Sequence, residues 1–96
     1  MSYMNNVQLY EMSKKKPTVK RGKYRVIVHN DNHNTFDHVI DSLMDVCGHV
    51  YLQSVQCALI VHEAKRCAVY TDTYEECYQV HTELRKLGIT VTVEKC

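Results

Sequence analysis

Residues 29–34 read HNDNHN, six consecutive polar side chains between two segments whose apolar spacing indicates core elements. Each of these side chains donates or accepts hydrogen bonds, and binding residues concentrate on loops that a rigid scaffold holds. Asparagine and aspartate also form Asx-turns and helix caps in the absence of any ligand. The stretch therefore predicts either a binding loop or a polar connection, and its spacing alone favours neither.

The chain also has five cysteines and six histidines, the residue types of thiol enzymes and zinc sites. Cys47 and His49 are the one close ligand pair, and no second pair has zinc-like spacing, so we expect no metal and no cofactor. No G-x-S-x-G elbow or phosphate-binding glycine loop is present. A thiol enzyme with a Cys/His nucleophile pair stays an open alternative. Because free cysteines are often compact core residues, we expect this protein to have no catalytic activity.

Charge divides the chain near residue 23. Residues 1–23 carry six Lys or Arg and one Glu, whereas residues 24–96 carry six basic and ten acidic side chains. The acidic body would repel phosphate, and we expect no nucleic-acid partner. Residues 1–23 lack a sustained apolar period and contain the one proline, which predicts a flexible basic N-terminal extension before a core domain over residues 24–96.

The cysteines are odd in number and form no C-x-x-C pair, which favours reduced thiols. The N-terminal stretch MSYMNNVQLYEM has no apolar h-region, and no stretch approaches the ~18 apolar residues of a membrane helix. We therefore expect a cytoplasmic protein without membrane contact. We also expect the protein to be a monomer.

Apolar spacing predicts the elements that hold the polar loop. Alternation over residues 24–28 predicts a strand before it. Thr35 is an N-cap candidate for a helix over residues 36–46, which Gly48 ends. A second helix is expected over residues 52–64. It has two neighbouring stripes, and this pattern indicates that the helix is covered on two sides. One stripe consists of Leu52, Val55, Leu59 and His62, and the other of Ala58 and Val61.

The remaining pattern predicts a strand over residues 67–71, a helix from about residue 74 to Gly88, and a strand over residues 89–93. Thr71 and Asp72 are the N-cap candidates for that helix. The order β-α-α-β-α-β predicts an α+β sandwich in which a three-stranded antiparallel sheet packs on helices.

Two stretches of the chain resemble the ClpS family, adaptors that deliver proteins with destabilising N-terminal residues to a Clp-family AAA+ unfoldase. They are YRVIVHNDNHNTFDHVI, residues 24–40, and CALIVHEAKRCAVYT, residues 57–71. The resemblance extends over residues 24–94 and includes the N-D-x-x-x-T loop and the V-H pair near the end of the second helix. It is closest to the branch with N-T-F where better-known members have T-P-M, and the predicted element order is that of the family.

The resemblance implies a site for the free α-ammonium group of a substrate at Asn30, Asp31 and His62. An ammonium group has three donors and no acceptor, so its site needs acceptors and preferably negative charge. An amide oxygen, a carboxylate and a neutral imidazole nitrogen meet that need.

The resemblance also implies an adjacent pocket for the first side chain of the substrate. The matching positions are Asn32, Asn34, Phe36, Val39, Ala58, Val61 and Ile89. Two of them depart from the better-known members: Asn32 replaces a second acid, and Ala58 replaces a gating residue that is often methionine. Ala58 makes the pocket roomier unless Phe36 fills it. We expect large aromatic or leucine-like first residues to be accepted.

Docking on the N-domain of an unfoldase of the ClpA or ClpC type is implied for the start of the third helix, at Thr71, Asp72, Thr73 and Tyr78. Tyr78 replaces a basic residue there. The extension over residues 1–23 matches a segment that engages the unfoldase during hand-over. The alternative is an unfoldase-binding modulator of the same fold without recognition of N-degrons, the destabilising N-terminal residues.

Overall fold

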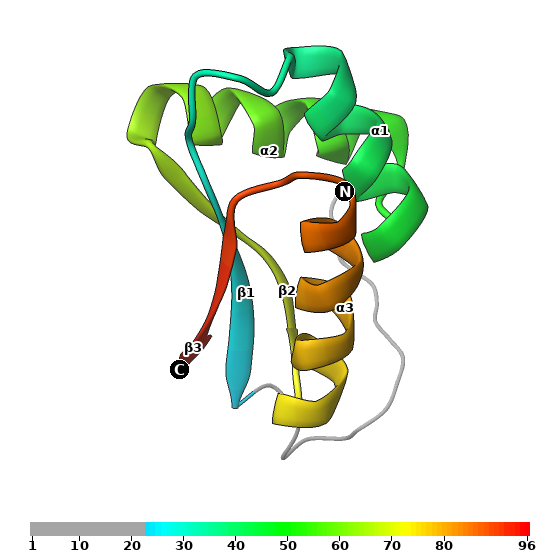
Figure 1. Cartoon of the computed structure of the whole chain (residues 1–96), viewed down its shortest axis with the longest axis vertical. Coiled ribbons are helices and arrows are strands. Elements are labelled where there is room, and N and C mark those ends of the chain that lie inside the picture. The colour runs from blue at the N-terminus through cyan, green and yellow to red at the C-terminus, as the bar shows by residue number, and fades with distance from the viewer. Residues whose placement is uncertain (1–22) are drawn as a thin grey trace, which may run out of the picture.

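The computed structural model describes residues 23–96, so the predicted N-terminal extension, apart from Lys23, lies outside the described residues. Six elements follow one another in the predicted order, which confirms the α+β class (Figure 1). They are β1 (Tyr24–His29), α1 (Phe36–Cys47), α2 (Tyr51–Ala64), β2 (Arg66–Asp72), α3 (Tyr74–Lys86) and β3 (Val91–Lys95).

The three strands form one antiparallel sheet in the order β2-β1-β3, so the strand that leads into the polar loop lies in the middle. Helix α3 lies along the sheet, whereas α1 and α2 pack on each other near the end of the sheet where the polar loop leaves β1 (Figure 1). The polar loop therefore starts from the most firmly paired strand and ends on a helix.

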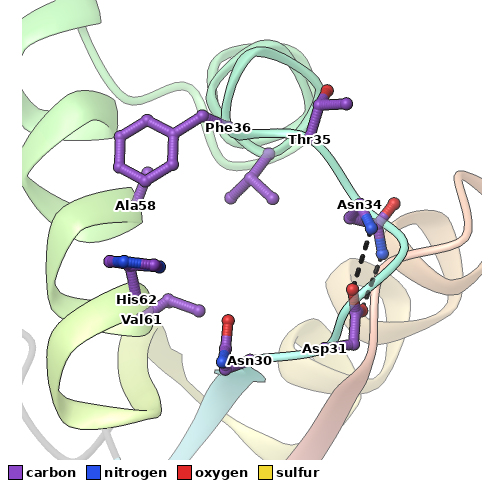
Figure 2. A pocket seen from close by; sticks show the side chains of 9 residues that line it. Asn30, Asp31, Asn34, Thr35, Phe36, Ala58, Val61 and His62 are labelled. Carbon is purple, nitrogen blue, oxygen red and sulfur yellow. Dashed lines mark hydrogen bonds between the residues drawn. The ribbon is translucent and has the colours of Figure 1, made fainter.

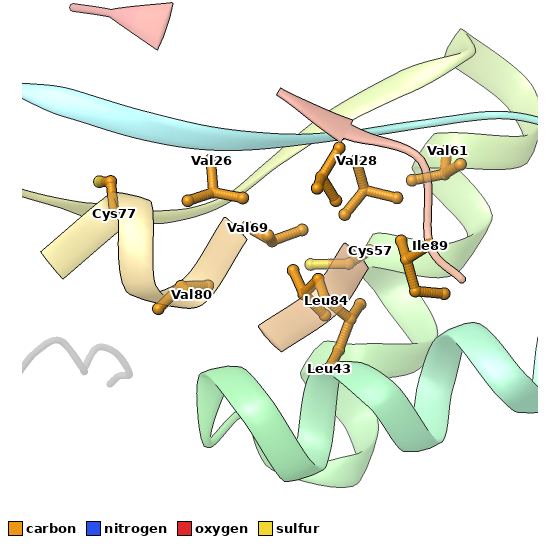
Figure 3. Close-up of a cluster of buried hydrophobic side chains, with 11 residues drawn as sticks. Val26, Val28, Leu43, Cys57, Val61, Val69, Cys77, Val80, Leu84 and Ile89 are labelled. Carbon is orange, nitrogen blue, oxygen red and sulfur yellow. The ribbon is translucent and has the colours of Figure 1, made fainter. Parts of the chain in front are cut away.

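The core lies between the sheet and the three helices (Figure 3). Val26 and Val28 of β1 point into it, and Leu43, Cys57 and Leu84 reach it from the three helices. Burying a side chain of this kind stabilises the fold by about 1.5 to 3 kcal/mol relative to leaving it exposed. The site described below is built on elements that this core holds rigid.

Helix α1 begins and ends as its sequence predicts. The Thr35 hydroxyl accepts a hydrogen bond from the His38 backbone N–H at 3.1 Å, an N-cap contact of the kind that stabilises a helix start. Gly48 has φ of 73°, the left-handed conformation that glycine adopts at low cost, and its N–H donates to the Leu43 carbonyl. The loop therefore enters α1 in a defined direction.

Two predicted boundaries are wrong by about two residues. The N-cap of α3 is Thr73, whereas the sequence predicts Thr71 or Asp72. Both of these residues belong to β2, which pairs with β1 as far as Asp72. The last strand starts at Val91 instead of Ile89, since the chain after α3 first passes through Gly88 in a left-handed conformation, with φ of 84°.

The prediction that both apolar stripes of α2 are covered is also wrong. Its buried residues are Ser54, Cys57, Ala58 and Val61, whereas Leu52 and Leu59 are 65% and 46% exposed. One face of α2 packs against the core and α1, and the opposite face lies at the surface. Within residues 23–96 no helix combines the length and apolar character needed to cross a membrane.

Candidate functional site

A pocket of about 90 Å³ opens between the polar loop, the first turns of α1 and the second half of α2 (Figure 2). One wall is polar and comes from the loop, and the other is apolar and comes from the two helices. The lining residues are Asn30, Asp31, Asn34, Thr35, Phe36, Val39, Ala58, Val61 and His62. The fold thus brings together the residues predicted for the amine site and most of those predicted for the side-chain pocket.

Asn32 and Ile89 do not line this pocket, which corrects their predicted place. Asn32 is exposed on the loop, while Ile89 is buried in the core just before β3. Thr35 does line the pocket, although its sequence position predicts only a helix cap. No feature of the sequence distinguishes a capping threonine that also faces a cavity from one that does not.

Asn30 and His62 come from distant parts of the chain, and a backbone hydrogen bond between Asn30 and Lys65 brings them to the same pocket edge. The Asn30 N–H donates to the Lys65 carbonyl oxygen at 2.8 Å, directly after the last turn of α2. Lys65 takes the left-handed conformation, with φ of 78°, and so turns the chain from α2 into β2. His62 lies one turn earlier, and this geometry sets Asn30 beside it at the pocket edge.

The side chains of Asn30 and His62 point toward the middle of the pocket (Figure 2). Among residues 23–96, no hydrogen bond engages the side-chain amide of Asn30 or the imidazole of His62. An amide oxygen and a neutral imidazole nitrogen are both acceptors. The pocket edge therefore offers two unused acceptors to a group that only donates.

The Asp31 carboxylate, in contrast, accepts hydrogen bonds from the loop and from Thr90. Oδ1 accepts from the backbone N–H groups of His33 and Asn34 at 3.1 and 2.9 Å. Oδ2 accepts from Asn34 Nδ2 at 2.7 Å and from Thr90 Oγ1 at 2.9 Å. Partial burial raises the pKa of Asp31, but the bonds from Asn34, Thr90 and His33 outweigh it and lower the pKa from 3.8 to about 2.

Asn34 and His38 fasten the loop and α1 to the connection between α3 and β3. Asn34 Nδ2 donates to the Gly88 carbonyl oxygen at 2.9 Å, and His38 Nε2 donates to the Leu87 carbonyl oxygen at 2.6 Å. A short polar loop without such partners would move freely, because it lacks apolar contacts of its own. These bonds give the polar wall of the pocket a fixed shape.

Phe36 covers the position where Ala58 leaves space. Its ring makes an edge contact with the His62 imidazole, with centroids 6.1 Å apart and planes at 78°. Phe36 is 41% exposed at the pocket edge, while Ala58 is buried beneath it (Figure 2). The small Ala58 side chain therefore does not simply enlarge the pocket, because Phe36 partly occupies the space that it leaves (Figure 2).

The four residues predicted to dock an unfoldase lie at the far end of β2 from the pocket. Thr71 and Asp72 end β2, Thr73 caps α3, and Tyr78 lies on the exposed side of α3. The Tyr78 ring stacks between Tyr74 and His81, with centroids 6.0 and 5.8 Å away. This surface is aromatic, and exposed aromatic rings are common in protein interfaces.

The cysteines form no metal site in the part of the chain that the structure describes. All five are free, and no group of three or more His, Cys, Asp or Glu side chains could hold an ion there. The nearest approach is Cys57 Sγ to His49 Nδ1 at 3.9 Å. Burial, with a smaller effect of Cys57, raises the pKa of Cys47 and of Cys67 to about 12, so both thiols stay protonated and weakly nucleophilic at neutral pH.

Comparison with known proteins identifies the family of this chain. Residues 19–92 match the family model of the ATP-dependent Clp protease adaptor protein ClpS. No curated protein matches the chain. Among solved structures, Agrobacterium tumefaciens ClpS2 bound to L-phenylalaninamide is similar, with a TM-score of 0.75 and 19% identity over 79% of this chain and 100% of that one. The match over most of its length shows that this chain belongs to the ClpS family of Clp protease adaptors.

Proposed function

We propose that this adaptor binds proteins by a destabilising, bulky hydrophobic N-terminal residue and delivers them to a Clp-family AAA+ unfoldase for degradation. The observation that carries the proposal is the pair of unused acceptors, Asn30 and His62, at the edge of an apolar pocket. A free protein N-terminus presents a donor-only cation on the same Cα atom that bears the first side chain.

The amine chemistry favours a free N-terminus over an internal segment of a protein. An α-ammonium group donates three hydrogen bonds and accepts none, and the Asn30 oxygen and a His62 nitrogen supply two acceptors. The ionised Asp31 in the same wall adds negative potential, which favours a cation. An acylated or internal backbone nitrogen has a single donor and no charge, and so loses most of this interaction.

The pocket chemistry favours a large apolar first side chain. Phe36, Val39 and Val61 form the apolar wall, and the small Ala58 lies at its base. L-Phenylalaninamide, the ligand named for the Agrobacterium protein, combines a free amine with a benzyl side chain. We therefore place Phe, Tyr, Trp and Leu among the preferred first residues, and β-branched ones among the excluded.

The unfoldase N-domain, of the ClpA or ClpC type, docks in this proposal on Thr71, Asp72, Thr73 and Tyr78. The seven residues of β2 separate this surface from the pocket by roughly 20 Å, at about 3.3 Å per residue. Substrate and unfoldase then bind without competing for the same surface. Residues 1–23 engage the unfoldase during hand-over, and the adaptor itself acts as a cytoplasmic monomer without catalytic activity.

One alternative function has a specific observation in its favour. Asn32 supplies no second acid, and the Asp31 carboxylate is already bonded within the loop, so no carboxylate in the loop is free for an ammonium group. A ClpS-fold module of this kind could bind the unfoldase and modulate it without recognising N-degrons.

Fluorescence anisotropy with peptides that differ only in their first residue separates the two functions. The adaptor predicts tight binding of peptides that start with Phe, Tyr, Trp or Leu, and weak binding of those that start with Asp or Val. Equal binding of Phe and Asp starts would refute the recognition of N-degrons. Binding of the unfoldase N-domain together with no peptide binding would establish the modulator instead.

A further inference from the structure

We infer that Asp31 acts in substrate binding as a positioning residue, and that the direct contacts to the substrate amine come from Asn30 and His62. The inference rests on the proposed function and deepens it, because it divides the three residues of the amine site into two roles. The contrast between a fully bonded carboxylate and two unused acceptors in one pocket carries it.

The acceptor capacity of Asp31 is used up within the protein. A carboxylate has about four lone-pair directions, and four donors already occupy them. They are the backbone N–H groups of His33 and Asn34, the amide of Asn34 and the hydroxyl of Thr90. An incoming ammonium group would have to displace one of these donors and leave it without a partner, which costs free energy.

The Asp31 side chain also points away from the middle of the pocket (Figure 2). Figure 2 shows the Asp31 carboxylate turned toward Asn34, while Asn30 and His62 point toward the middle of the pocket. The Asp31 side chain lines the pocket but is only 14% exposed, so it contributes negative potential while its oxygens stay bonded within the protein. The exposed His33 imidazole lies 3.7 Å from Oδ2, and among residues 23–96 no other basic side chain lies within 4 Å of the carboxylate.

The bonds of Asp31 fix the residue before it. The Thr90 hydroxyl ties Asp31 to the chain at the start of β3, where the His29 N–H also donates to the Thr90 carbonyl at 2.8 Å. Asn30 is also held directly, because its backbone N–H donates to the Lys65 carbonyl oxygen. Asn30 therefore lies between two anchors, and a change at the Thr90 anchor moves its amide relative to His62.

Thr90 gives the sharpest test, because its side chain bonds Asp31 and it does not line the pocket. Thr90→Val removes the hydroxyl at nearly constant shape. The expected result is a three- to tenfold weaker affinity for a peptide that starts with Phe, about the loss of one hydrogen bond. Thr90→Ser keeps the hydroxyl and is expected to restore the wild-type affinity.

Thr92→Val is the matched control, because Thr92 is two residues further along and its hydroxyl bonds His29 at 2.8 Å, outside the site. We expect it to bind as the wild type does. A direct contact between Asp31 and the amine predicts the opposite result for Thr90→Val, because freeing Oδ2 would leave affinity unchanged or raise it. Either of these outcomes would overturn the inference.

A double-mutant cycle gives an independent readout. If Thr90 acts through Asp31, the loss of peptide affinity that Thr90→Val causes in the wild type disappears in an Asp31→Asn background. A loss of the same size in both backgrounds would mean that Thr90 acts independently of Asp31, and the inference fails. Wild-type protein that binds no Phe-start peptide would instead refute the proposed function, and the inference with it.

Discussion

The backbone N–H of Asn30 donates to the carbonyl oxygen of Lys65 at 2.8 Å, which joins the polar loop to the end of α2. This bond connects two segments that are separate in sequence and brings Asn30 to the turn that follows His62. Because the contact is made by the backbone, this bond does not depend on which side chains stand at positions 30 and 65. The site is therefore a property of the fold as much as of the HNDNHN stretch.

Asn30→Ala is expected to weaken binding of a Phe-start peptide by about tenfold or more, since a hydrogen bond to a charged group contributes about 1.5 to 3 kcal/mol. The matched control is Asn32→Ala in the same loop, because the exposed Asn32 side chain does not line the pocket. Anisotropy titrations of both variants provide the measurement. Equal losses in the two variants would show that the loop, and not the Asn30 amide, determines affinity.

Removal of the His62 imidazole is expected to weaken peptide binding. His62→Phe keeps a ring of similar size but has no acceptor, so affinity for a Phe-start peptide should fall by about tenfold or more, since a hydrogen bond to a charged group contributes about 1.5 to 3 kcal/mol. The His62→Gln variant keeps an acceptor oxygen and is expected to lose less. Anisotropy titrations of both variants provide the measurement, and equal losses in the two would argue against a role of a His62 acceptor in amine binding.

The order of elements and the approximate position of the site could be predicted from the sequence, because both depend on short-range patterns. Apolar spacing defines α1, and the capping chemistry of Thr35 and Gly48 defines its ends. The exposed face of α2 could not be predicted, since Leu52 and Leu59 follow the same period as buried residues. Periodicity gives the faces of a helix, but not which of them has a partner.

Pocket shape is expected to depend on position 58. Ala58→Met adds side-chain volume to the pocket that Ala58 and Phe36 both line, and overpacking of a bound aromatic side chain there costs about 1 to 3 kcal/mol. Affinity for peptides that start with Trp or Phe should therefore fall by about tenfold, and affinity for those that start with Leu should fall less. Leu59→Met, one residue further on the exposed face, is the matched control and should leave the first-residue preference unchanged. The same loss for Trp, Phe and Leu starts would contradict this account of the pocket.

Asp31 makes a contribution to stability that acid removes. Its pKa is about 2 in the folded protein against an ordinary value of 3.8, so the charged form is favoured by folding. This contribution, roughly 2 kcal/mol, is fully present well above pH 4 and is lost as pH falls through about 2. Asp31→Asn should therefore be less stable than wild type at pH 7, and the difference should vanish near pH 2.

Urea unfolding of both proteins at several pH values measures this difference. The control is Asp41→Asn on the exposed side of α1, which should leave the stability difference near zero throughout. A gap between wild type and Asp31→Asn that stays constant down to pH 2 would mean that its hydrogen bonds do not stabilise the ionised carboxylate.

The division of roles within the polar loop could not be predicted from residue types. Asn30 and Asp31 are adjacent and both have acceptor oxygens, yet one side chain is unused and the other is bonded to four donors. Three of these donors come from His33 and Asn34 in the loop, and the fourth, the Thr90 hydroxyl, is 59 residues away and has no visible relation to the loop in sequence. Long-range contacts of single side chains are the part of this site that required the structure.

The central claim, recognition of a free N-terminus, is tested most directly by titrating a Phe-start peptide and its N-acetylated twin against the same protein. Acetylation removes the charge and two of the three donors but leaves the benzyl side chain in place. The account predicts that acetylation weakens binding by at least about a hundredfold, the loss of charged hydrogen bonds to Asn30 and His62. Equal affinity of the two peptides would contradict it.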